Sequence, residues 1–177
     1  MKKMIVVLLA VVACSCNNSG TATKEAGKDT TTSVTTPAAN YAYSIEKPDN
    51  WQIGSTANVG IALNCLKAWE EGKMDESLKY FGDTIRVQFD GLDQKMSNDS
   101  LKAFLSSGRN SYKSVSEKMH DWESVISKNK SEEWVTLWYT QTWETKDGIK
   151  DSSAVVNDLQ LRNGKIIRLS EYNRKLH

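Results

Sequence analysis

Asn157 and Arg168 are the polar residues that the strand pattern best places for ligand binding. Both fall in long alternating segments near the C-terminus, and we expect them to project from one face of a β-sheet. An arginine donates paired hydrogen bonds to a carboxylate or phosphate, and an amide both donates and accepts. If this face borders a pocket, the pair would bind an anionic or carbonyl-bearing ligand. The structural alternative is that Arg168 pairs with a surface carboxylate such as Glu171 or Asp158.

Asp90 and His120 are the candidate acid–base residues. Asp90 follows an apolar strand, and burial beside a pocket would raise the pKa of its carboxyl. It also precedes Gly91, and aspartate is ordinary in such a turn. His120 titrates near neutral pH and could exchange a proton at a pocket, or it could be a half-exposed strand residue. With 2 histidines in the chain, the sequence predicts no metal site and no cofactor.

The elements that position these side chains are predicted to be helices in the first part of the folded region and strands of a sheet in the rest. Apolar residues at helical spacing predict a helix that begins at Ser55 or Thr56 and stops at Gly72. A short second helix begins at Asp75 and ends at Gly82, and Ser97 caps a third that ends at Gly108. Alternation predicts a first strand in "TIRVQFDG", a loop in "DGLDQKMS", and four long strands over about 114–127, 133–146, 150–162 and 165–173.

Two dipeptides, Asp147-Gly148 and Asn163-Gly164, predict two-residue hairpin turns that fix the strand register. The predicted opposing pairs are Trp138 with Asn157, Trp134 with Leu161, Leu161 with Ile166, Leu159 with Arg168, and Val155 with Tyr172. The other face collects Val135, Leu137, Tyr139, Trp143, Val156, Ile167 and Leu169. Since both faces are rich in apolar residues, we expect helices to cover one face and a second copy of the chain to cover the other. A single bulge would exchange the faces.

The N-terminus has the pattern of an export signal. Lys2 and Lys3 precede an apolar run that ends at Ala13 and is too short to span a bilayer. The following "VVAC" resembles the lipobox of bacterial lipoproteins, which implies lipidation at Cys14, with Cys16 as the alternative; plain secretion is the rival interpretation. We therefore expect a signal peptide over 1–13, a lipidated flexible tether and arm over 14–54, and one folded domain over 55–177. The third cysteine, Cys65, is predicted to be a buried core residue.

The folded part resembles a known superfamily. The segments "ALNCLKAWEEGKMDESLKYFGDTIRVQFDG", "SNDSLKAFLSSG" and "LQLRNGKIIRLSEYNRKL" look like the nuclear transport factor two-like superfamily, closest to its SnoaL-like polyketide-cyclase branch. The resemblance implies an α+β, cone-shaped roll in which N-terminal helices pack in the concave face of a curved antiparallel sheet. Dimers through the outer sheet face are common in that superfamily.

The catalytic residues of the superfamily's enzymes are not matched. The first-helix tyrosine of the steroid-isomerase branch falls near Cys65, and Asp90 stands only near the position of its acid. The dehydratase branch uses a His–Asp pair, whereas His120 and Asp121 are neighbours on a strand and point to opposite faces. The resemblance therefore implies a fold and a pocket without a copied mechanism.

The function predicted from these features is a lipid-anchored envelope protein, facing the periplasm, with a non-catalytic pocket for a small apolar molecule or a peptide. Another envelope protein is a possible partner, and a homodimer is expected. The net charge of +1, with no basic run, argues against nucleic acid. The alternative function is a cofactor-free lyase, isomerase or cyclase that uses Asp90 or His120. The predicted pocket residues are Trp69, Trp134, Trp138, Asn157, Arg168 and Tyr172.

Overall fold

The computed structural model describes residues 41–46 and 50–176. The predicted signal peptide, with Cys14 and the alternative Cys16, lies outside these residues, as does the tether up to residue 40. The chain divides into two units, Met1–Ser44 and Ile45–His177, and every described helix and strand belongs to the second unit. None of the described helices has the length and apolar character needed to cross a membrane.

Three helices form where the spacing of apolar residues predicts them: α1 (Thr56–Glu70), α2 (Met74–Leu78) and α3 (Asn98–Asn110). Each of the two longer helices begins with a serine cap, because the Ser55 hydroxyl accepts from the backbone N–H of Ala57 and the Ser97 hydroxyl accepts from that of Ser100. The second helix is shorter than predicted, since the chain turns after Leu78 and enters a strand.

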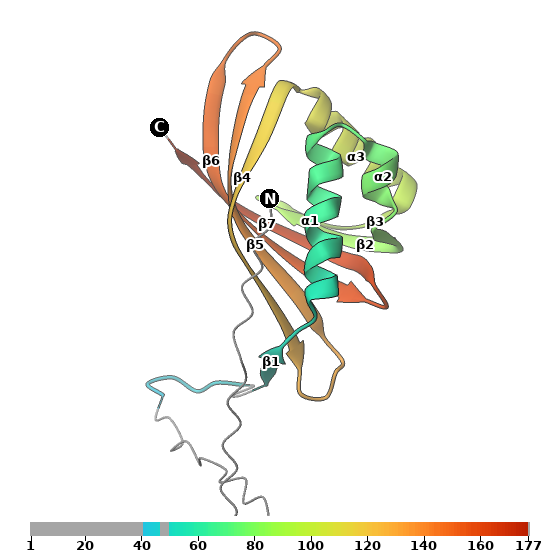
Figure 1. Ribbon diagram of the computed structural model, residues 1–177, viewed down its shortest axis with the longest axis vertical. Coiled ribbons are helices and arrows are strands. Elements are labelled where there is room, and N and C mark those ends of the chain that lie inside the picture. The colour runs from blue at the N-terminus through green and yellow to red at the C-terminus, as the bar shows by residue number, and fades with distance from the viewer. Residues whose placement is uncertain (1–40, 47–49, 177) are drawn as a thin grey trace, which may run out of the picture. The chain divides into compact units, whose positions relative to one another are not determined.

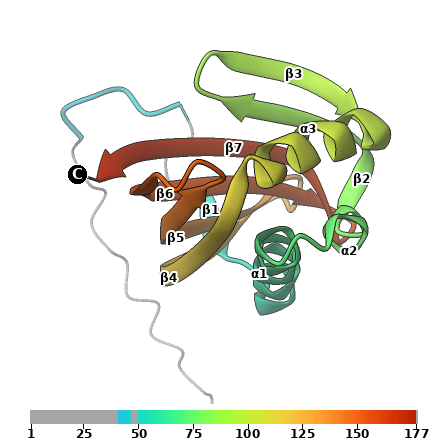
Figure 2. The same cartoon turned by 90° about the horizontal axis from the view of Figure 1, so that it is seen from above.

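Seven strands form one curved sheet in the order β1-β4-β5-β6-β7-β2-β3. Their bounds are β1 (Trp51–Ile53), β2 (Phe81–Phe89), β3 (Leu92–Ser97), β4 (Tyr112–Ser127), β5 (Glu133–Thr145), β6 (Lys150–Arg162) and β7 (Lys165–Leu176). Every neighbouring pair is antiparallel except β2 and β7, which are parallel. All three helices lie on the concave side of the sheet (Figures 1 and 2). The predicted α+β roll is confirmed.

Two short strands were not expected from the sequence. The predicted loop "DGLDQKMS" contains β3, which pairs with β2 through a tight turn at Asp90 and Gly91. Gly91 has a φ of 72°, a conformation that glycine adopts without strain. The segment before the first helix contributes β1, which pairs with the end of β4. The two strands lie at the two edges of the sheet; β1 has only 3 residues, and the polar residues of β3 obscure its alternating pattern.

The register predicted for β5 and β6 was wrong by one residue. Asn157 lies opposite Leu137 rather than Trp138, and Trp134 lies opposite Gln160. The hairpin contains three loop residues, because the backbone N–H of Thr145 donates to the carbonyl of Ile149 and Gly148 adopts a φ of 82°. A type I turn followed by a left-handed glycine is the common three-residue hairpin, and it competes with the two-residue turn at Asp-Gly. One extra loop residue transfers Asn157 to the opposite face.

The second hairpin forms as predicted and is then interrupted. Asn163 and Gly164 have φ values of 52° and 70° and make a two-residue turn, and Leu161 lies opposite Ile166. A bulge follows, so that Leu159 lies opposite Leu169 instead of Arg168, and Tyr172 lies opposite Val156 instead of Val155. Because of the bulge, Leu169 and Glu171 lie on one face of the sheet, and Arg168 and Tyr172 lie on the other.

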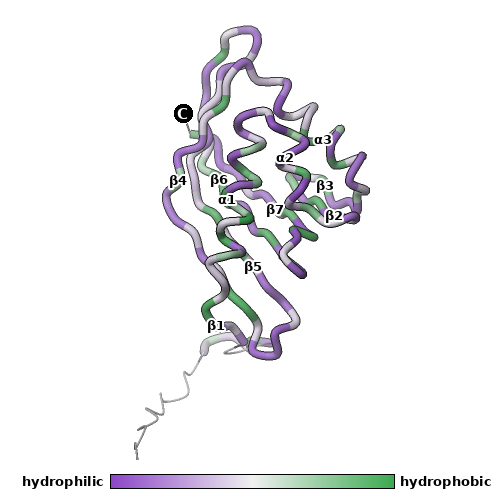
Figure 3. Tube along the Cα trace, turned by 45° about the vertical axis from the view of Figure 1, so that its right-hand side comes forward, coloured by the Kyte–Doolittle hydropathy of each residue, from purple (hydrophilic) through white to green (hydrophobic). Residues whose placement is uncertain are grey.

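The helices cover the face that carries Leu137, Tyr139, Asn157 and Leu159. This inner face, α1 and α3 supply most of the buried core, including Val59, Ala62, Ile85, Val87, Leu101, Val135, Leu161 and Ile166. Along the strands apolar and hydrophilic positions alternate, while the hairpin turns are hydrophilic (Figure 3). The outer face carries Trp134, over whose ring the Arg168 guanidinium lies at 5.4 Å. A homodimer through this outer face stays a prediction.

Candidate ligand-binding cavity

A cavity of about 550 Å³ lies between the helices and the inner sheet face. Helix α1 contributes Ala62, Cys65, Leu66 and Trp69, whose spacing of three and four residues places them on one side of the helix. The remaining apolar lining comes from β2, α3 and the sheet, through Phe81, Phe89, Phe104, Leu105, Leu159 and Leu169. A mostly apolar hollow of this size is typical of small-molecule sites.

Polar groups gather at one end of the cavity, which we call the polar end. It comprises Tyr112, Tyr139, Gln141, Asn157 and Glu171, all of which line the cavity. The Asn157 amide Nδ2 donates to the Tyr139 hydroxyl oxygen over 3.0 Å. Asn157 is only 6% exposed, and its Oδ1 has no hydrogen-bond partner. A buried amide oxygen without a partner carries a desolvation cost that a bound donor would remove.

Glu171 brings an ionisable group to the polar end. It lies directly opposite Asn157 in the β6–β7 pair, and directly opposite residues in a sheet share a face. Burial raises the pKa of the Glu171 carboxyl to about 7, opposed by a hydrogen bond with Asn173. The carboxyl therefore exchanges a proton readily near neutral pH.

Glu117 is a second carboxyl beside the polar end. It lies on β4 opposite Gln141, so its side chain shares the inner face with a cavity-lining residue. Both carboxyl oxygens are buried and have no hydrogen-bond partner. Burial, followed by repulsion from Glu70 and Glu171, raises the pKa of Glu117 to about 8, and Lys67 opposes this shift.

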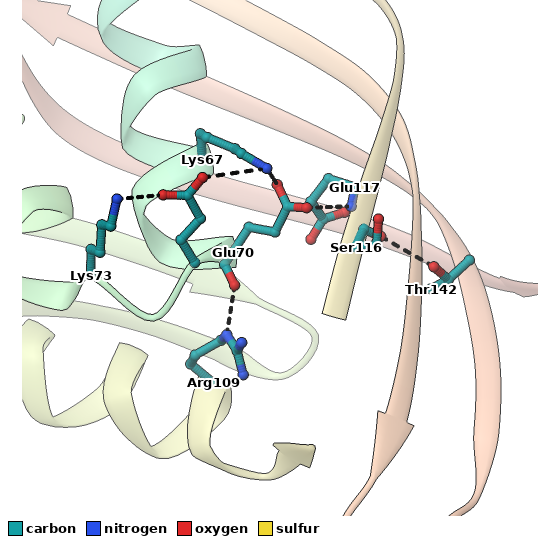
Figure 4. A network of polar contacts seen from close by, with 8 residues as sticks. Lys67, Glu70, Lys73, Arg109, Ser116, Glu117 and Thr142 are labelled. Atoms are coloured by element: carbon teal, nitrogen blue, oxygen red, sulfur yellow. Dashed lines mark hydrogen bonds and ion pairs between the residues drawn. The ribbon is translucent and has the colours of Figure 1, made fainter. Parts of the chain in front are cut away.

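The surroundings of Glu117 explain why Lys67 acts on it only from a distance and forms no ion pair with it. The Lys67 ammonium contacts Glu70 at 2.9 Å and Glu71 at 3.6 Å, and it is well exposed (Figure 4). The Arg109 guanidinium donates to the backbone carbonyl of Glu70 instead of to a carboxyl oxygen. Glu70 in turn accepts from the backbone N–H of Glu117. The Lys67 ammonium and the Arg109 guanidinium are thus engaged by Glu70 and Glu71 and do not contact the Glu117 carboxyl.

The phenols and the thiol of the cavity remain protonated at neutral pH. Burial raises the pKa of Tyr139 well above its ordinary value, and the negative charge of Glu171 adds to the effect. The pKa of Tyr112 is raised for the same two reasons. Burial also raises the pKa of the Cys65 thiol to about 12, and the residue belongs to the core as predicted. The tyrosines can therefore donate hydrogen bonds, and Cys65 is not a nucleophile.

The structure brings together two of the six predicted pocket residues. Trp69 and Asn157 line the cavity, and the Trp69 indole N–H donates to the backbone carbonyl of Leu105 over 3.2 Å. The other four are absent from the cavity lining and lie on the outer sheet face: Trp134, Trp138, Arg168 and Tyr172. These four residues were predicted on the wrong side because the one-residue register error and the bulge exchange the two faces of the sheet. The Arg168 guanidinium donates to Gln88 over 2.7 Å, instead of pairing with a carboxylate.

Neither candidate acid–base residue lies at the cavity. Asp90 is exposed in the turn between β2 and β3. His120 is exposed at a bulge in β4, where its Nε2 shares a hydrogen bond of 2.8 Å with the Thr140 hydroxyl. Sequence reasoning missed Glu117 and Glu171. Strand alternation would have indicated both, had the three-residue hairpin and the bulge been recognised. Among the residues that the structure describes, no cluster of side chains could hold a metal ion.

No family model matches the chain, and no curated protein matches it. Solved structures do share its fold. A nuclear transport factor 2-like protein of unknown function from Exiguobacterium sp. 255-15 is 18% identical, with a TM-score of 0.51 over 66% of this chain and 98% of that one. A putative polyketide cyclase from Xanthomonas campestris pv. campestris is 15% identical, with a TM-score of 0.51 over 66% and 90%.

A third similar structure is an LEH-like epoxide hydrolase from M. tuberculosis, which is 14% identical with a TM-score of 0.54 over 68% of this chain and 84% of that one. At such identities the likeness shows the fold alone. The chain has the nuclear transport factor 2-like fold, as its sequence resemblance implied. Proteins of this fold include enzymes with different reactions, so the function must be argued from the cavity.

Proposed function

We propose that the cavity binds a small, mostly apolar molecule that carries one polar group. The observation that supports this proposal is the division of the cavity into an apolar part and a polar end. Rings and aliphatic side chains of α1, α3 and β2 would hold the body of the ligand. Asn157, Tyr139 and Glu171 would hold its polar group, because the Asn157 Oδ1 lacks a partner and lies beside the cavity.

The proposal predicts that filling the cavity abolishes binding of an apolar dye. Leu66 lines the cavity from α1, and the Leu66→Trp variant would occupy part of its volume. We expect the neutral dye N-phenyl-1-naphthylamine to fluoresce on binding the chain, and its affinity to fall at least tenfold in Leu66→Trp. Asn64→Trp is the matched control, since Asn64 lies on the exposed side of the same helix. Equal dye binding by both variants would place the binding site elsewhere.

A second candidate function is proton-transfer catalysis without a cofactor, as in a lyase, isomerase or cyclase. The pKa of about 7 of Glu171 favours it, because a general base works best when its pKa lies near the working pH. In this account Glu171 would take the proton, and Tyr139 and Asn157 would stabilise the charge that forms. Once a bound molecule is identified, Glu171→Gln should bind it without converting it. Equal conversion by the variant would exclude this role.

We further propose that the protein is a lipoprotein of the bacterial cell envelope that faces the periplasm. The support is the sequence of the first 16 residues alone. A mature N-terminus that begins with a lipidated Cys14 is expected, and its mass distinguishes Cys14 from Cys16 and from an unmodified secreted chain.

A further inference from the structure

The unpaired buried side-chain atoms at and beside the polar end are all oxygens, which accept hydrogen bonds when the carboxyl is ionised. Within the described residues, the buried side-chain oxygens and nitrogens without a partner are Glu117 Oε1, Glu117 Oε2 and Asn157 Oδ1. The Asn157 side chain is almost completely buried and lines the cavity, so a group bound in the cavity would be the source of a donor for its Oδ1. A ligand group rich in N–H donors fits this set better than a carbonyl or a carboxylate, which only accepts.

The charges around the polar end also favour a ligand group that carries a positive charge. Glu171 lines the cavity and Glu117 lies near enough for the two carboxyls to repel each other. In the described part of the chain, neither carboxyl forms an ion pair with a lysine or arginine, since Lys67 contacts Glu70 and Glu71. Two buried carboxyls without a counter-charge form a site that a positive charge would stabilise.

Aromatic side chains also line the cavity. Trp69, Tyr112 and Tyr139 line the cavity together with Glu171, and the faces of such rings attract cations. The apolar lining contributed by α3 and β2 would accommodate only an uncharged remainder of the ligand.

We propose that the cavity selects a cationic amine with an apolar body, whose ammonium group lies beside Asn157 and Glu171 at the polar end. This inference rests on the proposed ligand-binding function and names the chemical class of the ligand. The ammonium would donate to the Asn157 Oδ1 and to the Glu171 carboxylate, which lie directly opposite each other on β6 and β7, while Glu117 would add negative charge from beside the polar end.

Binding of such a cation must be linked to proton release. The charged and titratable groups that face the two carboxyls are Glu70 and Lys67 from α1, Tyr112 from β4 and Tyr139 from β5. Without ligand, the raised pKa values keep Glu117 mostly protonated and Glu171 about half protonated at pH 7. A bound cation favours the ionised carboxyls, so about one proton per ligand would leave the protein.

The test compares three probes of equal shape: 4-phenylbutylamine, 4-phenylbutanol and 4-phenylbutyrate. Their binding to the full chain is measured by titration calorimetry at pH 7 in phosphate and in Tris, whose different ionisation enthalpies report released protons. We expect the amine to bind at least tenfold more tightly than the alcohol and the carboxylate to bind most weakly. Proton release should accompany the amine alone.

Two variants assign the effect to the carboxyls. Glu117→Gln and Glu171→Gln keep the shape of a protonated side chain, and together they should reduce the preference for the amine below threefold and abolish proton release. Glu123→Gln, an exposed change on the same strand as Glu117, should leave both unchanged. Tight binding of the alcohol or the carboxylate would overturn the cation proposal while retaining ligand binding. Binding of no probe at millimolar concentration would count against both.

Discussion

The free energy of unfolding should fall by several kcal/mol between pH 5 and pH 8.5. The pKa values of Glu117 and Glu171 are about 8 and about 7 in the folded protein, against an ordinary value of 4.5. The folded state therefore retains protons that the unfolded state has already released. Stability is fully present below the ordinary value and is lost as the pH rises through the folded values.

The expected loss is about 3–5 kcal/mol for the two residues together, after a reduction for the partial solvent access of Glu117. Groups with lowered pKa values, among them Asp75 and Asp93, change the free energy of unfolding only below their ordinary pKa of 3.8, which is outside the range from pH 5 to pH 8.5. Ionisation of the Cys65 thiol, with an ordinary pKa of 9.0, adds a loss only at higher pH.

Urea unfolding at a series of pH values measures this effect. The double variant Glu117→Gln/Glu171→Gln should be nearly insensitive to pH across the window, because both titrating groups are removed. Glu123→Gln, which removes an exposed carboxyl from the same strand, should retain the full dependence. A flat profile for the unchanged chain, or a steep one for the double variant, would show that these carboxyls are not buried as described.

Replacing each of two leucines on α3 by alanine should lower the free energy of unfolding by unequal amounts. Leu101 is fully buried in the core and does not line the cavity, so Leu101→Ala leaves a new void and should destabilise the chain by about 2–5 kcal/mol. Leu105 lies one turn later, is partly exposed and lines the cavity. Its side chain already adjoins empty space, so Leu105→Ala should cost about 1 kcal/mol.

The two variants serve as controls for each other, because residue type, helix and substitution are the same. Ligand or dye affinity should change in the opposite order, with a loss in Leu105→Ala and little change in Leu101→Ala. Chemical denaturation and dye titration measure the two effects. Equal destabilisation by both variants would mean that protein atoms pack against Leu105 in solution, because the cavity has collapsed.

The order and type of the main elements could be predicted from the sequence because local signals determine them. Ser55 and Ser97 cap helices, and period-two alternation marks the long strands. The Asn163-Gly164 turn was correct because both residues adopt positive φ, as a two-residue hairpin requires. These features depend on a few neighbouring residues and are therefore visible in one sequence.

The site was predicted poorly because it depends on register. Asp147-Gly148 fits a hairpin of either two or three loop residues, and the choice decides whether Asn157 lies beside Trp138 or beside Leu137. The bulge that shifts the register between Gln160 and Leu161 decides which face carries Glu171, and no local sequence signal marks it. The raised pKa values of the carboxyls arise from burial by helices distant in the sequence, which no local pattern records.

Native mass spectrometry of the chain, purified without denaturation from its own host, tests ligand binding most directly. We expect an additional mass of a small molecule that is released on unfolding, and that is absent when the Leu66→Trp variant is purified in the same way. We also expect the released molecule to be an amine with an apolar body. An apo mass for the unchanged chain, or an equal additional mass on the Leu66→Trp variant, would contradict the claim that this cavity is a binding site.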